Sequence, residues 1–431
     1  MKKLLLILLC LPLIGFGQGW DKIINGTGNN VGYSVQQTND GGYIVVGITA
    51  TGIWLVKTDL LGDTLWTKTY GGDELDDGYS VQQTTDGGYI ITGSTRSFGN
   101  GSLPGQSGSD VWLIKTDSQG DTLWTKTYGG SGSEVGNSVQ QTSDGGYVIC
   151  GYTTSFGNGS SDIYLIKTNI QGDTLWTRTI GGTDNDVGKS VQQTNNGGYI
   201  ITGFTESYGS GGGDLYLIKT NSLGDTLWTK TYGGVNFDNG WSVEQTNDLG
   251  YIVTGMIGGV VGGGPSVWLV KTDAQGDTLW TKTYDGSGAD YGRSVEQTSD
   301  GGYVICGYTT SWGPLARDVW LIKTNSQGDT LWTCTYGGLG WEEGWSVKQT
   351  SNGGYIIAGY KHITNLDDNL YLIKTDGCGN VTSTFNIPTP SSNRKLERVV
   401  DVLGRNTKGT KNEPLLYIYD DGTVEKRIVI E

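Results

Sequence analysis

The sequence predicts an all-β protein, a seven-bladed β-propeller of 28 strands, and three observations support this prediction. One stretch, DTLW, recurs at a nearly fixed period, which is typical of repeat architectures. Each repeat contains four short strand-like segments separated by Gly, Asn and Asp. The two ends of the array also complement each other, so a ring can close. The tryptophans of the DTLW stretch are spaced by 58 residues once and then by 52 residues four times: Trp66, Trp124, Trp176, Trp228, Trp280 and Trp332.

Four segments follow one another within each repeat. They read S-V-x-Q-T, GGY-[IV]-x-x-G, [WY]-L-[IV]-K-T and DTLWTKTY. Asp40-Gly41 lies between the first two segments and indicates a tight hairpin, because both central residues tolerate positive φ. Asp117–Asp121 predicts a slightly longer glycine-containing hairpin between the last two. Four strands in about 50 residues match one propeller blade.

The chain ends indicate how the ring closes. The first three segments occur seven times, but DTLW occurs only six times. Trp20–Gly26 aligns with Trp66–Gly72, and the last third-strand segment ends the array at Tyr371–Thr375. We expect the N-terminal fourth strand to pair with the three C-terminal strands, which removes exposed sheet edges. The alternative fourth strand, Gly379–Phe385, lacks the tryptophan.

Composition changes define the expected domains. Residues 1–17 read as a signal peptide, with two lysines, an apolar run and a small-residue cleavage site. The propeller is expected over 18–385 and a polar linker with prolines over 386–393. Residues 394–431 lack the repeat motifs and contain three strand-like runs, which predict a small antiparallel sheet.

Charge and cysteine content exclude several classes of function. The net charge is −15, which argues against nucleic acid and against anionic membranes. No segment outside the leader is long and apolar enough to cross a bilayer. Cys150 and Cys306 occupy the same second-strand position, and no CxxC or Cys/His spacing occurs, so no disulfide framework or zinc site is implied.

The C-terminal segment resembles a known sorting domain. Its V-D-x-x-G-R motif lies at Val400–Arg405, and Tyr417–Glu431 provides the Y-I-Y-x-[DN]-G ending with basic and β-branched residues. These motifs are similar to the C-terminal domain of type IX secretion substrates, although the upstream motifs of longer domains are faint or absent. The resemblance implies export by the type IX secretion machinery to the medium or the outer cell surface. Its motif positions are Asp401, Gly404, Arg405, Tyr417, Asp421, Gly422 and Lys426.

The repeats resemble two propeller families more loosely. The D-x-x-G-x-x-x-W hairpin at Asp117, Gly120 and Trp124 is similar to the tryptophan-docking turn of quinoprotein-type propellers. The glycine doublet and the blade length resemble kelch repeats, but here the doublet precedes the second strand. Neither resemblance implies a site residue.

Residues repeated in every blade predict structure, because a catalytic residue is needed only once. We expect each fourth-strand tryptophan to pack between neighbouring sheets. The third-strand lysine is expected to pair with a carboxylate or to extend outward. It occurs at Lys57, Lys115, Lys167, Lys219, Lys271, Lys323 and Lys374.

A repeated acidic position precedes each first strand. If the first strands are innermost, these side chains should surround the mouth of the central channel. They could cap their own loops by accepting backbone N–H groups, or they could form an electronegative vestibule or a Ca²⁺ site. The position holds Asn30, Asp76, Glu134, Asp186, Asp238, Asp290 and Glu342.

Aromatic residues gather in the variable loops of the same face. Exposed rings beside acids and amides would suit stacking on sugars, whereas rings that pack on their own loops would be structural. The candidate ligand-binding residues are Phe98, Phe156, Tyr208, Trp312 and Trp341.

The sequence therefore favours a non-catalytic binding or adhesion module for an extracellular glycan or protein, with no cofactor other than a possible Ca²⁺. A structural surface scaffold is the first alternative. A polysaccharide-degrading enzyme with paired carboxylates is the second. The single histidine, His362, and the absence of nucleophile motifs disfavour the enzyme.

Overall fold

The structure is a computed structural model that describes residues 19–100, 108–259, 263–313, 317–363 and 367–381, together with three strands between 396 and 428. The expected signal peptide (1–17) and linker (386–393) lie outside the described residues. Two compact units are present, residues 1–381 and 382–431, and each is described by itself.

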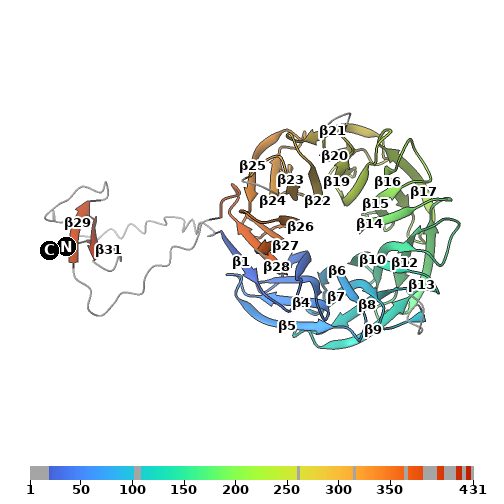
Figure 1. The fold of residues 1–431 in the computed structure, drawn as a ribbon, viewed down its shortest axis with the longest axis horizontal. Coiled ribbons are helices and arrows are strands. Elements are labelled where there is room, and N and C mark those ends of the chain that lie inside the picture. Colours follow the sequence, from blue (N-terminus) through green and yellow to red (C-terminus); the bar gives the residue numbers. More distant parts are fainter. Residues whose placement is uncertain are drawn as a thin grey trace, which may run out of the picture. The chain divides into compact units, whose positions relative to one another are not determined.

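The first unit consists of seven four-stranded antiparallel sheets arranged as the blades of a closed ring, which confirms the predicted fold (Figure 1). The innermost strands are β2 (Val31–Gln37), β6 (Asp76–Gln83), β10 (Glu134–Gln141), β14 (Asp186–Gln193), β18 (Asn239–Gln245), β22 (Asp290–Gln297) and β26 (Glu342–Gln349). The second strands are β3 (Tyr43–Thr49), β7 (Tyr89–Thr95), β11 (Tyr147–Thr153), β15 (Tyr199–Thr205), β19 (Tyr251–Ile257), β23 (Tyr303–Thr309) and β27 (Tyr355–Ile363).

The two outer positions of each blade follow the same order. The third strands are β4 (Gly52–Thr58), β8 (Asp110–Thr116), β12 (Asp162–Thr168), β16 (Asp214–Thr220), β20 (Ser266–Thr272), β24 (Asp318–Thr324) and β28 (Asp367–Thr375). The outermost strands are β5 (Thr64–Tyr70), β9 (Thr122–Tyr128), β13 (Thr174–Ile180), β17 (Thr226–Tyr232), β21 (Thr278–Tyr284), β25 (Thr330–Tyr336) and β1 (Trp20–Ile24).

Blade 7 is assembled from both ends of the propeller. Its strand order is β1-β28-β27-β26, and β1 pairs antiparallel with β28, with Trp20 opposite Lys374. In Figure 1 the blue β1 accordingly lies beside the orange strands that end the ring. The predicted closure is confirmed, and Trp20, not a strand after Gly379, completes the blade.

The hydrophobic core is divided among the junctions between blades. Each of the seven clusters of buried residues draws on two adjacent blades. At the junction of blades 1 and 2, Leu55 and Ile53 of β4 pack with Ile91 of β7 and Trp112 of β8, and the half-buried Trp66 covers their edge. The third strands are buried on both faces because a sheet lies on each side of them.

The turns follow the expected chemistry, with one exception. Glycines with positive φ occupy the turn between the first and second strands in six blades, as at Gly41 (φ 85°). In blade 5 the position is Leu249, which has a φ of 69°. A β-carbon makes this left-handed conformation costly, by about 1–2 kcal/mol.

The second unit contains a three-stranded antiparallel sheet in the order β29-β30-β31. The strands are β29 (Leu396–Asp401), β30 (Pro414–Tyr419) and β31 (Val424–Ile428), close to the three runs expected from the sequence. Within the described residues, no helix is long and apolar enough to span a membrane.

Candidate functional site

Every innermost strand contains a β-bulge near its start, on the face that carries the loops between blades. In β10, Gly136 pairs with Gly151 and Ser138 pairs with Cys150, so Asn137 is left without a partner residue. The other six innermost strands show the same shift between the Gly and the Ser of their G-x-S sequence. Bulges bend a strand and redirect the extra side chain, and they are common beside functional sites.

Paired glycines make this bulge possible. A β-carbon on Gly151 would lie 1.7 Å from the Val135 carbonyl oxygen, a distance that no side chain tolerates. The equivalent second-strand glycines of the other blades are equally crowded. The glycines therefore hold the backbone, and the bulged residue between them is free to vary.

The bulged residues do vary, in contrast to the residues around them. The next residues in the strand are Ser and Val in every blade, whereas the bulge holds aromatic, amide and basic side chains. The seven bulged residues are Tyr33, Tyr79, Asn137, Lys189, Trp241, Arg293 and Trp345.

All seven bulged residues line one cavity, which we call the axial pocket. It encloses about 340 Å³, and Val135 and Tyr152 complete its lining. The seven side chains come from positions up to 312 residues apart, Tyr33 and Trp345 being the extremes, and only ring closure brings them together. A pocket lined by aromatic rings with a few polar groups is the usual form of a small-ligand site.

Aromatic rings and two cations form a continuous cluster within the axial pocket. The Arg293 guanidinium carbon lies 4.1 Å from the ring centre of Trp241 and 4.2 Å from that of Trp345, and the Lys189 ammonium lies 4.8 Å from Trp241. Tyr33 continues the wall, 5.0 Å from Trp345 by ring centres. These distances fit cation–π contacts.

The two cations are poorly solvated. Burial, followed by repulsion from Arg293, lowers the pKa of Lys189 to about 8, and the neighbouring Cys150 opposes this only in part. Burial also lowers the pKa of Arg293. Burial and the carboxylates of Asp77, Glu343 and Asp368 raise the pKa of Tyr33 to about 12, so its phenol is neutral. The axial pocket thus holds two positive charges and neutral phenols at pH 7.

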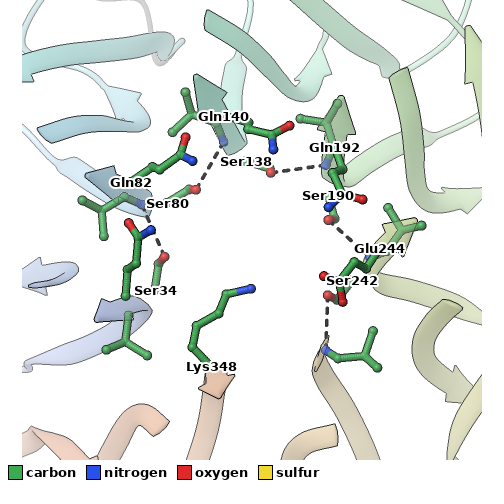
Figure 2. Close-up of a pocket in the computed structure, with 17 residues that line it drawn as sticks. Ser34, Ser80, Gln82, Ser138, Gln140, Ser190, Gln192, Ser242, Glu244 and Lys348 are labelled. Atoms are coloured by element: carbon green, nitrogen blue, oxygen red, sulfur yellow. Dashed lines mark hydrogen bonds between the residues drawn. The ribbon is translucent and has the colours of Figure 1, made fainter. Parts of the chain in front are cut away.

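Below the axial pocket, the channel is lined by a repeated layer that joins the blades. Each serine after the bulge accepts a hydrogen bond from the backbone N–H of the valine in the next blade, and seven such bonds close the ring. Figure 2 shows the part of this ring that begins at Ser34 and ends at Ser242. A second set of hydrogen bonds between blades lies two residues further along the innermost strands, for example from Gln83 N to Gln36 Oε1 at 2.7 Å. Repetition here has a structural cause.

Lys348 interrupts this second set of hydrogen bonds. Its ammonium group cannot accept a hydrogen bond, and Figure 2 shows its side chain reaching into the channel toward the side of Glu244. It lies 3.9 Å from Glu296 Oε1. Burial raises the pKa of Glu244, and Lys348 partly offsets this. The charges of this layer therefore compensate one another.

The repeated acids do not form a vestibule. They are at most 2% exposed. In blades 2 to 6 each carboxylate accepts a backbone hydrogen bond from its own loop, whereas Glu342 pairs with Lys361 Nζ at 3.1 Å. Glu134 accepts hydrogen bonds from Gly130 N at 2.8 Å and from Thr153 Oγ1 at 2.7 Å, and Asp290 accepts from Gly286 N and Ser311 Oγ in the same way. This arrangement corresponds to the loop-capping alternative. The bulged residues line the channel mouth instead.

Some capping acids face a second carboxylate from the preceding blade. Burial and then Glu342 raise the pKa of Asp318 to about 6, although Lys361 opposes the shift. Burial raises the pKa of Asp214, and repulsion from the Asp238 carboxylate raises it further. Asp76, Glu134, Asp186, Asp238, Asp290 and Glu342 each lie in a separate blade, and among the described residues no three His, Cys, Asp or Glu side chains gather into a group that could hold a metal.

The predicted loop aromatics are also separated by blade. Phe98, Phe156 and Tyr208 pack on third-strand aromatics of their own blades, with ring centres 5.1, 5.8 and 5.9 Å apart respectively. Trp312 and Trp341 are about half exposed, at 53% and 55%. The structure does not bring these five side chains together.

Trp341 is connected to the axial pocket through its neighbours. Its ring centre lies 5.3 Å from the Arg317 guanidinium, which lies 5.0 Å from Tyr308. Tyr308 in turn lies 5.7 Å from Arg293. Arg317 also pairs with Glu343. An aromatic and basic track therefore leads from the pocket across the junction of blades 6 and 7.

The sorting-motif residues lie in the second unit. Asp401 ends β29, Tyr417 lies in β30 and Lys426 in β31. The remaining motif positions, Gly404, Arg405, Asp421 and Gly422, lie outside the described residues.

The pocket residues were missed in the sequence because they have no motif. The available signal was variation: within G-x-S-V-x-Q-T, the residue after glycine changes from blade to blade while its neighbours stay the same. Only the bulge in the structure shows that the side chain at this position faces the central axis of the propeller.

Comparisons with known proteins are informative about the fold. No family model matches the chain. The chain is similar to regulatory protein FlaEY of Caulobacter vibrioides, with 26% identity over 156 residues, which cover 30% of this chain. The chain spans only 16% of the length of that relative.

Solved propellers are similar in architecture. The WD40 domain of Neurospora crassa Pan2 matches 81% of this chain and 89% of its own at 8% identity, with a TM-score of 0.47. Sqt1 from Chaetomium thermophilum matches 95% and 99% at 10% identity, also at 0.47. Drosophila Plexin A in complex with Semaphorin 1b matches 83% and 86% at 9% identity, with 0.48. These likenesses concern the fold alone.

Proposed function

We propose that this protein is a non-catalytic recognition module that binds an extracellular glycan or protein ligand in the axial pocket. The observation that carries the proposal is the variation of the seven bulged residues within an otherwise repeated frame. Stability accounts for residues that every blade shares. The bulged position holds Tyr, Asn, Lys, Trp or Arg, yet its seven side chains face one cavity, and a ligand explains this variation better than stability does.

The composition of the axial pocket supports binding over catalysis. Its nine lining residues include no carboxylate, histidine, cysteine or serine. Glycoside hydrolysis uses two carboxylates across the scissile bond, and the capping acids are buried in separate loops. Rigid aromatic rings are instead suited to hold a ligand at little entropic cost.

A binding screen tests the proposal. The full chain would be titrated against panels of extracellular polysaccharides and proteins, with product analysis to detect any cleavage. We expect binding without turnover, and we expect Trp241→Ala to abolish it. Trp312→Ala is the matched control, because it removes an indole from the same face outside the axial pocket. Loss with Trp312→Ala and not with Trp241→Ala would place the site in the loops and contradict the proposal.

We further propose that the C-terminal unit directs export by a type IX secretion system. The motif resemblance and the small antiparallel sheet support this. Deleting residues 394–431 should leave the protein in the periplasm of a bacterium that has the system, whereas the full chain should reach the medium or the cell surface. Equal export of both chains would contradict this role.

A further inference from the structure

We propose that the axial pocket selects a sugar that carries a carboxylate, the uronic acid residue of an acidic glycan. This inference rests on the proposed binding function and specifies its ligand. It is argued from the charges, the unpaired donors and the ring faces of the pocket.

The pocket cations differ from nearly all other basic side chains of the propeller. The third-strand lysines bond to an Asp or Asn and to a carbonyl, as Lys167 does to Asp144 and Thr168. Outer-strand basic residues pair with an aspartate of the next blade, as Lys126 does with Asp173. Lys189 and Arg293 form no ion pair among the described residues. The carboxylate of Glu343 acts on Arg293, but its ion pair is with Arg317. Two buried cations without an ion-paired carboxylate, in a chain of net charge −15, indicate an anionic ligand.

Two buried donors in the same place have no acceptor. Arg293 Nε and Trp345 Nε1 make no hydrogen bond within the described part of the chain. Leaving a buried donor unpaired is unfavourable, so a ligand or water must supply acceptors. A guanidinium presents a planar fork that matches the two oxygens of a carboxylate. Arg293 is therefore the expected carboxylate contact, with Lys189 as the second charge.

The walls of the pocket suit a sugar ring. Trp241, Trp345 and Tyr33 give the pocket an aromatic lining that suits the apolar face of a pyranose beside the Arg293 guanidinium, which lies over both indoles. Asn137 and the phenols of Tyr33 and Tyr79 provide hydrogen-bonding groups for its hydroxyls. Because a guanidinium fork fits phosphate as well as carboxylate, the choice of a carboxylated sugar over a phosphate ester is decided by the calorimetric comparison described below.

The rest of the glycan has a route out of the pocket. The track through Tyr308 and Arg317 leads to the exposed Trp341. A second sugar placed along it would meet another indole and another guanidinium. Trp341→Ala is therefore expected to weaken long oligosaccharides more than a single uronic acid.

Calorimetry with matched sugars tests the inference. The full chain is titrated with oligosaccharide pairs that differ only at C6, glucuronate against glucose and galacturonate against galactose. We expect the acidic member to bind at least roughly 30-fold more tightly, the usual scale for a desolvated charge contact. Arg293→Gln and Lys189→Gln should each remove most of this preference. Lys126→Gln, which removes an outer-strand cation, is the control and should change nothing.

Each outcome separates the two proposals. Equal affinity for acidic and neutral members, with Trp241→Ala still abolishing binding, would overturn the carboxylate and leave the recognition function in place. Preference for sulfated or phosphorylated sugars alone would also overturn the carboxylate. Failure of every saccharide to bind would overturn the inference. If, in addition, no protein ligand binds through the pocket, the proposed function fails as well.

Affinity at high pH provides an independent readout. The titratable groups that act on the pKa of Lys189 are Arg293, which lowers it, and Cys150, which raises it. A bound carboxylate stabilises the protonated amine, so affinity should fall as the pH rises above about 8. Lys189→Gln should bind weakly at every pH without this fall. The same pH profile in both proteins would contradict a role for Lys189.

Discussion

Lys219 and Lys189 belong to the same blade, and burial lowers the pKa of each to about 8. Lys219 lies on β16, where its ammonium donates to Thr220 O at 2.7 Å and to Asn196 Oδ1 at 3.3 Å. Lys189 occupies the bulge of β14, where it contacts the Trp241 ring and has no ion pair in the described chain. A lysine stands at the position of Lys219 in every blade, whereas at the bulge only blade 4 has lysine and only blade 6 has another basic residue, Arg293.

The two lysines differ in what their positions are needed for. The third-strand lysine is repeated because each blade needs the same link between its strands and its hairpin. The bulge residue changes because no blade needs it for folding. In this propeller, the residues that recur in every blade stabilise the fold, and the bulged position, where the residue changes between blades, forms the candidate site.

The strongest test of this distinction compares two aromatic truncations. Tyr199 is 1% exposed in the frame, and Tyr199→Ala should lower the free energy of unfolding by about 3–5 kcal/mol. Trp345 is only partly buried and lines the axial pocket, so Trp345→Ala should lower the free energy of unfolding much less but should abolish ligand binding. Urea unfolding and calorimetry of both variants measure this. An equally large loss of stability with Trp345→Ala would show that the pocket aromatics belong to the core.

The frame itself contains a natural substitution that sharpens the comparison. Asn196 replaces the aspartate found at Asp144 and Asp248, and Lys219 lacks a carboxylate partner. At Asp40 burial acts to raise the pKa, yet the bonds from Lys57, Thr38 and Gly42 hold it at about 2. Asn196→Asp should therefore stabilise the protein at pH 7 by about 1 kcal/mol.

The pH dependence of this variant has a definite sign. Between about pH 8 and 10.5 the unfolded wild-type chain holds one more proton at Lys219 than the folded chain, so wild-type stability rises with pH across this window. Asn196→Asp should remove the part of that rise that comes from Lys219, while Lys189 and Lys374, whose pKa values burial also lowers to about 8, keep theirs. Asp248→Asn, the converse change in blade 5, should introduce it at Lys271. Thermal melts from pH 7 to 10.5 follow both, and parallel curves for all three proteins would contradict the argument.

A second irregularity of the frame predicts a smaller gain. Leu249 adopts a φ of 69° where the other blades have glycine. Leu249→Gly removes this strain and adds glycine flexibility, so the net gain should be at most about 1 kcal/mol. Gly145→Leu is the matched control, because a β-carbon there meets only Ile170 at 3.9 Å, and it should destabilise. Chemical unfolding measures both, and a stabilising Gly145→Leu would refute the backbone explanation.

The smallest effect concerns the junction of blades 6 and 7. Other junctions carry a surface pair such as Lys230–Asp277, 2.8 Å apart, but Cys334 and Asn380 stand in these positions here. The double change Cys334→Lys with Asn380→Asp should raise the melting temperature slightly at low salt and not at high salt. Cys334→Lys alone is the control. A gain that persists at high salt would point to packing instead of charge.

The blade count, the order of strands, the ring closure and the separate C-terminal sheet could all be predicted from the amino-acid sequence. These features depend on local patterns, because short β-branched and aromatic runs predict strands and Asp-Gly between two such runs predicts a hairpin. The closure also followed from the sequence, because Trp20–Ile24 lacks a partner unless β28 provides one.

The position of the candidate site could not be predicted in this way, because it depends on contacts that form when the chain folds. Acids such as Glu134 looked available for a ligand, but their loops fold back and consume their oxygens. The bulge at Asn137 and its equivalents turns seven side chains toward the axis. The paired glycines around the bulge recur in every blade, but they do not by themselves show which way the bulged side chain points. Lys189, Trp241 and Arg293 lie 52 residues apart in the chain, so their contact exists only because the ring closes around them.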